Sequence, residues 1–153
     1  RALNQFIPEQ YRFMERVQHP AMDVAIAMLN YGYGILYGKI ANSLSRCGIV
    51  PYIGSLHSDE YGRPVLSYDM IELYRVWIDY IVYSLLAQNI ITEDYYSRDE
   101  RGAVWLESLG RRVMIQSVND YLAENESIKG MTRSRETHIF LYIQKFAQQL
   151  KHY

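Results

Sequence analysis

The sequence predicts an all-α fold, and three observations support it. Along most of the chain, apolar side chains recur at steps of three and four residues, the spacing that places them on one face of a helix. No run alternates apolar and polar residues with the period of two that a half-buried strand requires. No internal repeat or low-complexity linker divides the chain, so we expect residues 1–153 to form a single domain with a hydrophobic core.

The first predicted helix covers residues 22–46. Its apolar face consists of Ile26, Leu29, Tyr33, Leu36, Ile40 and Leu44. Gly48 provides a helix-ending residue, and Pro51 opposes resumption of the helix. The glycines at positions 32, 34 and 38 lack the spacing of a dinucleotide-binding loop, and no buried strand precedes them. We therefore interpret them as a flat helix face that another helix, or a nucleic acid backbone, can approach closely.

A connection rich in glycine and proline, residues 48–66, precedes the second predicted helix. This helix runs from near Ser67 to about Gln88, and Ser67 or Asp69 is available to cap its start. Its apolar face consists of Met70, Leu73, Trp77, Ile81 and Leu85. We expect a further short helix in the acidic segment that begins at Thr92.

Two more helices are predicted toward the end of the chain. The first covers residues 109–123 and carries Leu109, Val113, Val118 and Leu122 on one side. A loop around Lys129 and Gly130 follows, and Thr132 or Ser134 caps the last helix. The inward face of that helix consists of Ile139, Ile143, Phe146 and Leu150. We expect the charges of Arg111, Arg112, Arg133 and Arg135 to be solvated near helix ends, where the last two could also hold a DNA backbone.

Composition and charge exclude several classes of protein. The formal net charge is −1, so no overall attraction draws the chain to nucleic acid, and DNA contacts require a local basic patch. The lone Cys47 excludes an intramolecular disulfide and fits a reducing compartment, so we expect a cytoplasmic protein. No apolar run reaches the ~18 residues of a membrane-spanning helix, and we expect no membrane partner. The 15 tyrosines, against 4 phenylalanines, indicate either a core with a hydrated rim or a surface that stacks bases.

One group of polar residues is typical of a metal site. His57 follows a turn rich in proline and glycine, and Asp69 and Glu72 lie three residues apart at the start of the second helix. An imidazole and carboxylates can hold a divalent metal ion that drives phosphate-ester chemistry. In the alternative interpretation, Asp69 only caps the helix and Glu72 is solvated. Arg63 and Arg75 flank the group and could either pair with these carboxylates or clamp a phosphate.

Three motifs resemble one protein family. They read LNYGYG from Leu29, CG-x-x-PYIG-x-LH from Cys47 and GRP-x-LSYDMIE-x-YR from Gly62. In order and spacing they resemble the helical catalytic domain of CRISPR-associated protein one, the integrase that inserts spacers into CRISPR arrays. The resemblance implies that His57 and Glu72 are metal ligands and that Asp69 supports them.

The same resemblance implies an activity and partners. The activity is metal-dependent DNA cleavage and integration by phosphoryl transfer, with Mg²⁺ or Mn²⁺ as the cofactor. The DNA partners are the spacer precursor and the CRISPR repeat, and Arg63 and Arg75 are the candidate DNA contacts. The full protein is expected to be a homodimer that works with the companion CRISPR-associated protein two.

The chain also departs from this family. The family's first glutamate ligand lies in a motif resembling E-G-x-x-A-R, and neither Glu9 nor Glu15 has matching surroundings. The family's N-terminal β-rich domain has no counterpart in the sequence. We therefore expect a fragment that is inactive by itself. Two alternatives remain: a catalytically incomplete helical module for DNA binding or assembly, and a helical bundle that binds a protein partner.

Overall fold

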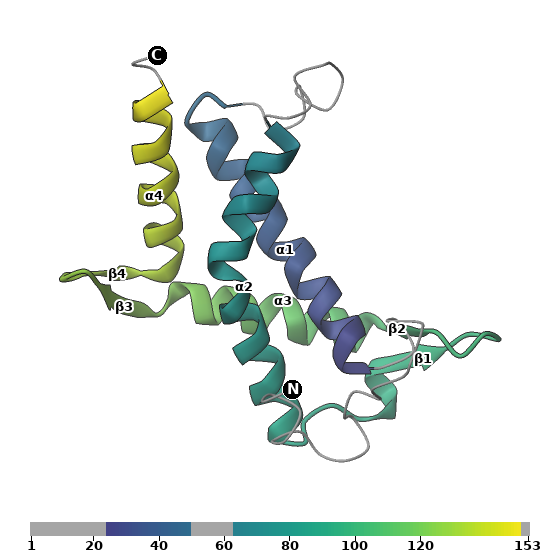
Figure 1. The fold of residues 1–153 in the computed structure, drawn as a ribbon. Coiled ribbons are helices and arrows are strands. Elements are labelled where there is room, and N and C mark those ends of the chain that lie inside the picture. Colours follow the sequence, from purple (N-terminus) through teal and green to yellow (C-terminus); the bar gives the residue numbers. More distant parts are fainter. Residues whose placement is uncertain (1–23, 50–62, 151–153) are drawn as a thin grey trace. The chain divides into compact units, whose positions relative to one another are not determined.

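The computed structural model describes residues 24–49 and 63–150, and for residues 63–69 it describes the backbone alone. The elements are α1 (Val24–Arg46), α2 (Arg63–Ala87), the 3₁₀ helix η6 (Glu93–Tyr95), β1 (Tyr96–Arg98), β2 (Val104–Leu106), α3 (Ser108–Ala123), β3 (Asn125–Ile128), β4 (Met131–Ser134) and α4 (Arg135–Leu150) (Figure 1). The predicted predominantly helical fold is confirmed. Within the described ranges, no helix is long and apolar enough to cross a membrane.

The helix ends follow local backbone chemistry. α1 ends at Arg46 as predicted, because Gly48 adopts a φ of 84° and the Ile49 amide then donates to the Leu44 carbonyl oxygen at 2.8 Å. α2 begins at Arg63, earlier than predicted, and Pro64 in the first turn suits this start. The prediction that Ser67 or Asp69 caps α2 is wrong, because both positions lie inside the helix.

Two short antiparallel hairpins were missed by the sequence analysis. β1 pairs with β2, and β3 pairs with β4. The predicted loop at Lys129 and Gly130 is the turn of the second hairpin, with φ values of 52° and 81°. Two consecutive positive φ values are what a two-residue type I′ turn requires, and that turn matches the twist of paired strands.

The residues group into two compact units, and the first comprises Arg1–Gly34 and Val76–Val118. Its described core side chains are Val24, Ala25, Ala27, Met28, Ile78, Ile81, Val82, Leu85, Leu86, Ile91, Val104, Met114 and Val118. Gly32 lies against two of them, because a Cβ at this position would be 2.6 Å from Ile78 Cγ2 and 3.0 Å from Met114 Cε. The close-packing interpretation is thus right for Gly32. For Gly34 and Gly38 it stays a prediction, because no described atom lies within 4 Å of where a Cβ would be at either position.

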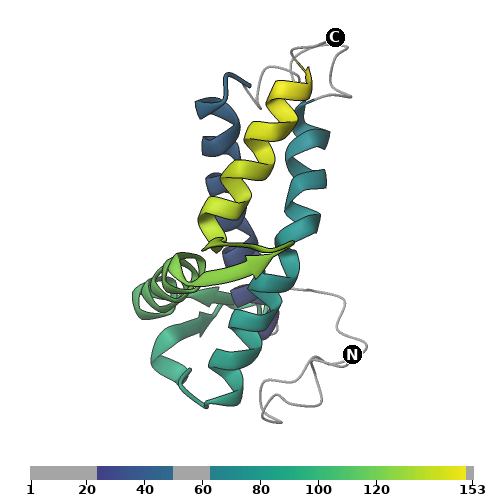
Figure 2. The same cartoon turned by 90° about the vertical axis from the view of Figure 1, so that its left-hand side faces the viewer.

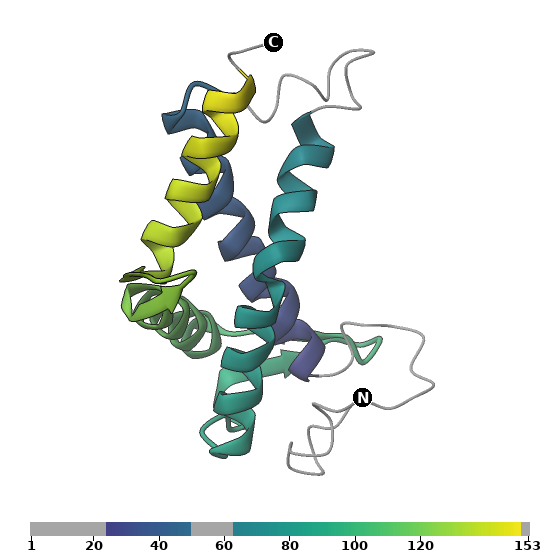
Figure 3. The same ribbon diagram turned by 60° about the vertical axis from the view of Figure 1, so that its left-hand side comes forward.

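The second unit comprises Ile35–Arg75 and Asn119–Tyr153, and in it α4 lies beside the later half of α1 (Figures 2 and 3). Its described core side chains are Leu36, Ile40, Ala41, Leu44, Ile49, Met70, Ile71, Tyr74, Leu122, Ile139, Ile143 and Ala147. Lys39 Nζ lies 3.1 Å from Glu136 Oε1, which joins the two helices at their surface.

Three residues that we predicted on buried faces are instead exposed: Leu73, Leu109 and Leu150.

Arg135 holds the second hairpin to the helices beside it. Its side chain is 13% exposed, with Nε 2.9 Å from Glu126 Oε1 and Nη1 2.8 Å from Glu124 Oε1. Its guanidinium carbon lies 3.7 Å from the centre of the Tyr121 ring. Burial alone would lower the pKa of Arg135, but hydrogen bonds to both glutamates raise it. The expectation of a solvated Arg135 is therefore wrong, and this guanidinium stabilises the fold.

Ser134 begins α4. Its Oγ accepts a hydrogen bond of 3.1 Å from the Thr137 amide, so Ser134, and not Thr132, is the cap.

Candidate functional site

The predicted metal ligands differ in how far the structure describes them. His57 lies outside the described residues. Asp69 is a residue of α2, and Arg63 is its first residue, but the side chains of both are outside the described set. The convergence of His57, Asp69 and Glu72 therefore stays a prediction. The backbone of α2 places positions 69 and 72 slightly less than one turn apart.

Glu72 is the one predicted ligand whose side chain is described. It is 64% exposed, and its Oε1 accepts a hydrogen bond of 2.8 Å from Arg75 Nη1. Exposed ion pairs of this kind contribute only about 0–1 kcal/mol, so the pair is easily exchanged for other partners. Of the two roles considered for Arg75, pairing with a carboxylate is the one observed.

The donor chemistry of Glu72 suits a hard divalent cation. Mg²⁺ and Mn²⁺ prefer oxygen ligands, and an ionised carboxylate keeps further lone pairs after accepting one hydrogen bond. Among the described side chains, no three of the His, Cys, Asp and Glu residues gather closely enough to hold a metal ion. The carboxylate of Glu72 fits the metal predicted from the sequence, and the side chains of the other two predicted ligands, His57 and Asp69, lie outside the described set.

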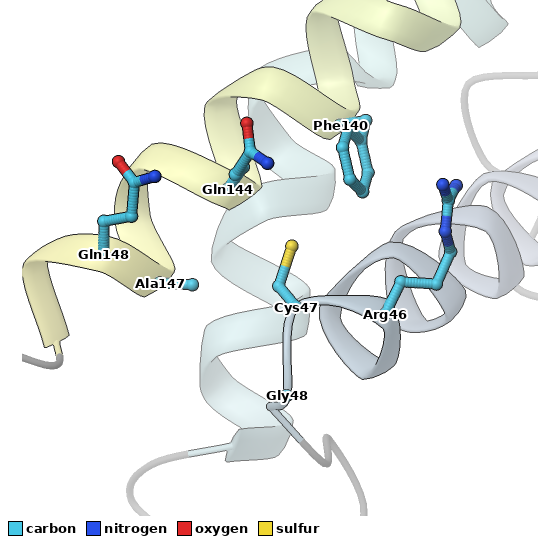
Figure 4. Close-up of a pocket in the computed structure, with 7 residues that line it drawn as sticks. All are labelled: Arg46, Cys47, Gly48, Phe140, Gln144, Ala147 and Gln148. Atoms are coloured by element: carbon cyan, nitrogen blue, oxygen red, sulfur yellow. The ribbon is translucent and has the colours of Figure 1, made fainter.

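A pocket of about 420 Å³ lies between the end of α1 and α4, within the second unit. Figure 4 shows its lining residues, which are Arg46, Cys47, Gly48, Phe140, Gln144, Ala147 and Gln148. The guanidinium carbon of Arg46 lies 4.4 Å from the centre of the Phe140 ring. This interaction joins the two walls of the pocket.

A groove of about 400 Å³ lies in the first unit, between the beginning of α1 and the β1–β2 hairpin. It is lined by Ala27, Asn30, Tyr31, Val104, Trp105, Leu106 and Arg111. Trp105 is 60% exposed, and its Nε1 donates to Asp99 Oδ2 at 3.0 Å. That hydrogen bond, together with those from the backbone amides of Ala103 and Arg101, lowers the pKa of Asp99.

Arg111 is fixed at the wall of this groove. Its Nη1 donates to the Leu106 carbonyl oxygen at 2.6 Å, and its Nη2 donates to Ser108 Oγ at 3.3 Å. The residue is exposed, as predicted, but its guanidinium is held against the chain rather than freely solvated. Sequence reasoning missed this groove. Its walls come from residues 27–31 and 104–111, which no local pattern connects.

Comparison with known proteins identifies close relatives. Residues 1–120 match a family model described as CRISPR associated protein Cas1. The curated CRISPR-associated endonuclease Cas1 1 of Thermodesulfovibrio yellowstonii is 31% identical over 126 residues, which are 82% of this chain and 40% of that relative. The chain therefore spans less than half the length of this relative.

Two solved structures share the fold. A casposase bound to integration product aligns with a TM-score of 0.83 and 25% identity, covering 97% of this chain and 45% of that chain. A Cas6-RT-Cas1–Cas2 complex aligns with a TM-score of 0.75 and 22% identity, covering 97% of this chain and 16% of that chain. The second likeness bears on the fold alone.

Proposed function

Because this chain belongs to the CRISPR-associated Cas1 family, we propose that it forms part of a metal-dependent DNA endonuclease and integrase that inserts spacer DNA into CRISPR arrays. The observation that carries this proposal is the extent of the family match, residues 1–120, which includes every residue of the predicted site. The chain spans 40% of a curated relative, so the activity is proposed for the whole protein and not for this chain alone.

The proposed ligand set is His57, Asp69 and Glu72. A bound Mg²⁺ or Mn²⁺ would polarise the scissile phosphodiester and stabilise the charge that develops on it. The exposed carboxylate of Glu72 and its position one turn after Asp69 support this assignment. Mg²⁺ gives up its water reluctantly and needs several oxygen ligands, so we expect the chain alone to bind it weakly.

Arg63 and Arg75 are the proposed contacts to DNA phosphates. Arg75 neutralises Glu72 at 2.8 Å, and this weak surface pair can open when the carboxylate or the guanidinium gains another partner. A guanidinium can hold a phosphate through two parallel hydrogen bonds. The same residue would thereby balance the charge of the site before DNA binds and orient a phosphate afterwards.

The proposed partners are spacer-precursor DNA, the CRISPR repeat and the Cas2 protein, with a Cas1 homodimer in the full protein. The solved relative that supports a DNA partner is a casposase bound to an integration product. The Cas2 protein and the homodimer are proposed from the membership of this family. The lone Cys47 favours the cytoplasm as the compartment.

Binding of Mn²⁺ and of a splayed-end DNA duplex tests the proposal. Glu72→Gln keeps the size and the helix but removes the charge, so we expect the affinity for Mn²⁺ to fall about tenfold or more. Glu93→Gln is the matched control, because Glu93 is an exposed glutamate of η6 outside the proposed site. Equal Mn²⁺ affinity in the two variants would contradict the metal site. DNA binding that persists in that case would favour the catalytically incomplete DNA-binding module.

A further inference from the structure

The groove beside the β1–β2 hairpin has a chemistry that the proposed metal site does not use. Its lining residues include two aromatic rings, Trp105 and Tyr31, one amide, Asn30, and one cation, Arg111. None of the described residues that line it carries a carboxylate. A groove that combines aromatic faces with a positive charge is complementary to a ligand that has both a π-face and a negative charge.

Trp105 is held in position before any ligand arrives. Its indole N–H donates to Asp99 Oδ2 at 3.0 Å, and Asp99 Oδ1 is itself held by the Arg101 and Ala103 amides at 2.8 and 3.0 Å. The ring therefore loses little side-chain freedom when something packs on it. Because the N–H is already engaged, the ring offers its apolar faces, which suit stacking better than hydrogen bonding.

Arg111 supplies the positive charge of the lining. Its hydrogen bonds to the Leu106 carbonyl oxygen and to Ser108 Oγ engage two of the five N–H donors of a guanidinium. The remaining donor capacity is available to a phosphate, which guanidinium groups bind well. Asn30 adds an amide that can both donate and accept, as the edge of a base requires.

We infer that this groove binds one unstacked nucleotide of single-stranded DNA, with its base on Trp105 and its phosphate on Arg111. This assignment rests on the proposed function, which supplies DNA as the partner. It adds a nucleotide subsite built from residues outside the set His57, Asp69 and Glu72.

Fluorescence of Trp105 measures the occupancy of the groove. The chain has two tryptophans, so a Trp77→Phe background leaves Trp105 as the single reporter. The probe is a short oligothymidylate, added in the presence of EDTA so that the metal site plays no part. We expect it to quench the fluorescence of Trp105, since stacking brings a base onto the indole.

Variants then separate stacking from charge. Trp105→Ala should weaken the binding of labelled oligothymidylate about tenfold, and Trp105→Phe should weaken it less because a ring remains. Arg111→Ala should weaken binding and reduce its salt dependence by about one phosphate contact. Arg112→Ala is the matched control, because it removes the same charge from the next residue of α3, which does not line the groove. Circular dichroism checks that each variant stays folded.

The outcomes distinguish this subsite from the metal site. An absence of quenching, or equal affinity of Trp105→Ala and the unmodified chain, would overturn the nucleotide subsite. If Glu72-dependent binding of Mn²⁺ and duplex binding persist in that case, the proposed function stands without it. If neither single-stranded nor splayed DNA binds, the proposed function fails as well. A fluorescence change that depends on protein concentration without DNA would assign the groove to a second copy of the chain.

Discussion

Replacing Gly32 with alanine tests the close packing at the centre of the first unit. The added Cβ would lie 2.6 Å from Ile78 Cγ2 and 3.0 Å from Met114 Cε. Methionine is flexible and its end can move aside, but the γ-methyl of a β-branched residue is fixed by its rotamer. Ile78 is 0% exposed, so its side chain cannot move aside without disturbing the close packing around it.

Two opposing terms set the size of the effect. Alanine is favoured over glycine within a helix by about 0.8–1.0 kcal/mol. Overpacking a tight core typically costs about 1–3 kcal/mol. Gly38→Ala gains the first term without the second, because nothing lies within 4 Å of its Cβ. We therefore expect Gly32→Ala to be less stable than Gly38→Ala by about 1–3 kcal/mol, although both changes raise the helix propensity of α1.

Urea unfolding followed by circular dichroism measures this difference. The midpoint of Gly38→Ala should rise above that of the unmodified chain, while that of Gly32→Ala should stay level or fall. The slopes should agree among the three proteins, so that the midpoints report stability alone. Equal stabilisation by both substitutions would refute the packing argument, because it would mean that Ile78 yields at no cost.

Three further predictions concern stability and pH. Arg135→Ala should destabilise the chain by about 1–3 kcal/mol in urea unfolding, since it removes the hydrogen bonds of this largely buried guanidinium to Glu124 and Glu126 and its contact with the Tyr121 ring, whereas Arg133→Ala should change stability by less than about 0.5 kcal/mol. Burial, reinforced by the neighbouring Tyr142, raises the pKa of Tyr74 to about 12. The contribution of the neutral Tyr74 hydroxyl to stability should therefore be complete below about pH 10 and disappear as the pH rises toward 12. If the most alkaline step of an absorbance titration disappears in Tyr74→Phe, this step belongs to Tyr74. The hydrogen bond from Trp105 and those from backbone amides lower the pKa of Asp99. The contribution of the ionised Asp99 to stability should therefore be present above the ordinary aspartate pKa of about 3.9 and disappear as the pH falls through the lower pKa of the folded protein. An acid transition of Trp105 fluorescence that is the same in Asp99→Asn would contradict this role of Asp99.

Periodicity predicted the helices because each is long enough to repeat its pattern several times. It chose the wrong face at Leu73, which is 51% exposed, because α2 is apolar on most sides and exposes Val76 and Tyr80 as well. The hairpins escaped prediction because strands of three or four residues are too short to display an alternation. The turn at Lys129 and Gly130 was visible only as a loop.

The candidate sites depended on two different kinds of information. Glu72 was identified from short motifs in a fixed order, and its exposure agrees with a role at the surface. The groove at Trp105 has no such signal, because Asn30 and Arg111 are distant in the sequence and meet only through tertiary structure. Arg135 was misjudged because a charge near a helix start looks the same in sequence whether or not a hairpin folds over it.

The interactions of Arg135 also bear on the order in which the chain folds. Its hydrogen-bond partners Glu126, Glu124 and Tyr121 lie only 9, 11 and 14 positions earlier. Lys39 and Glu136, by contrast, are 97 positions apart. Contacts with short loops need little closure entropy and form fast, and a hairpin with a favoured turn forms within microseconds. We expect the segment from Tyr121 to Arg135 to form early during folding. Contacts between residues far apart in the sequence, such as Lys39 and Glu136, should form later.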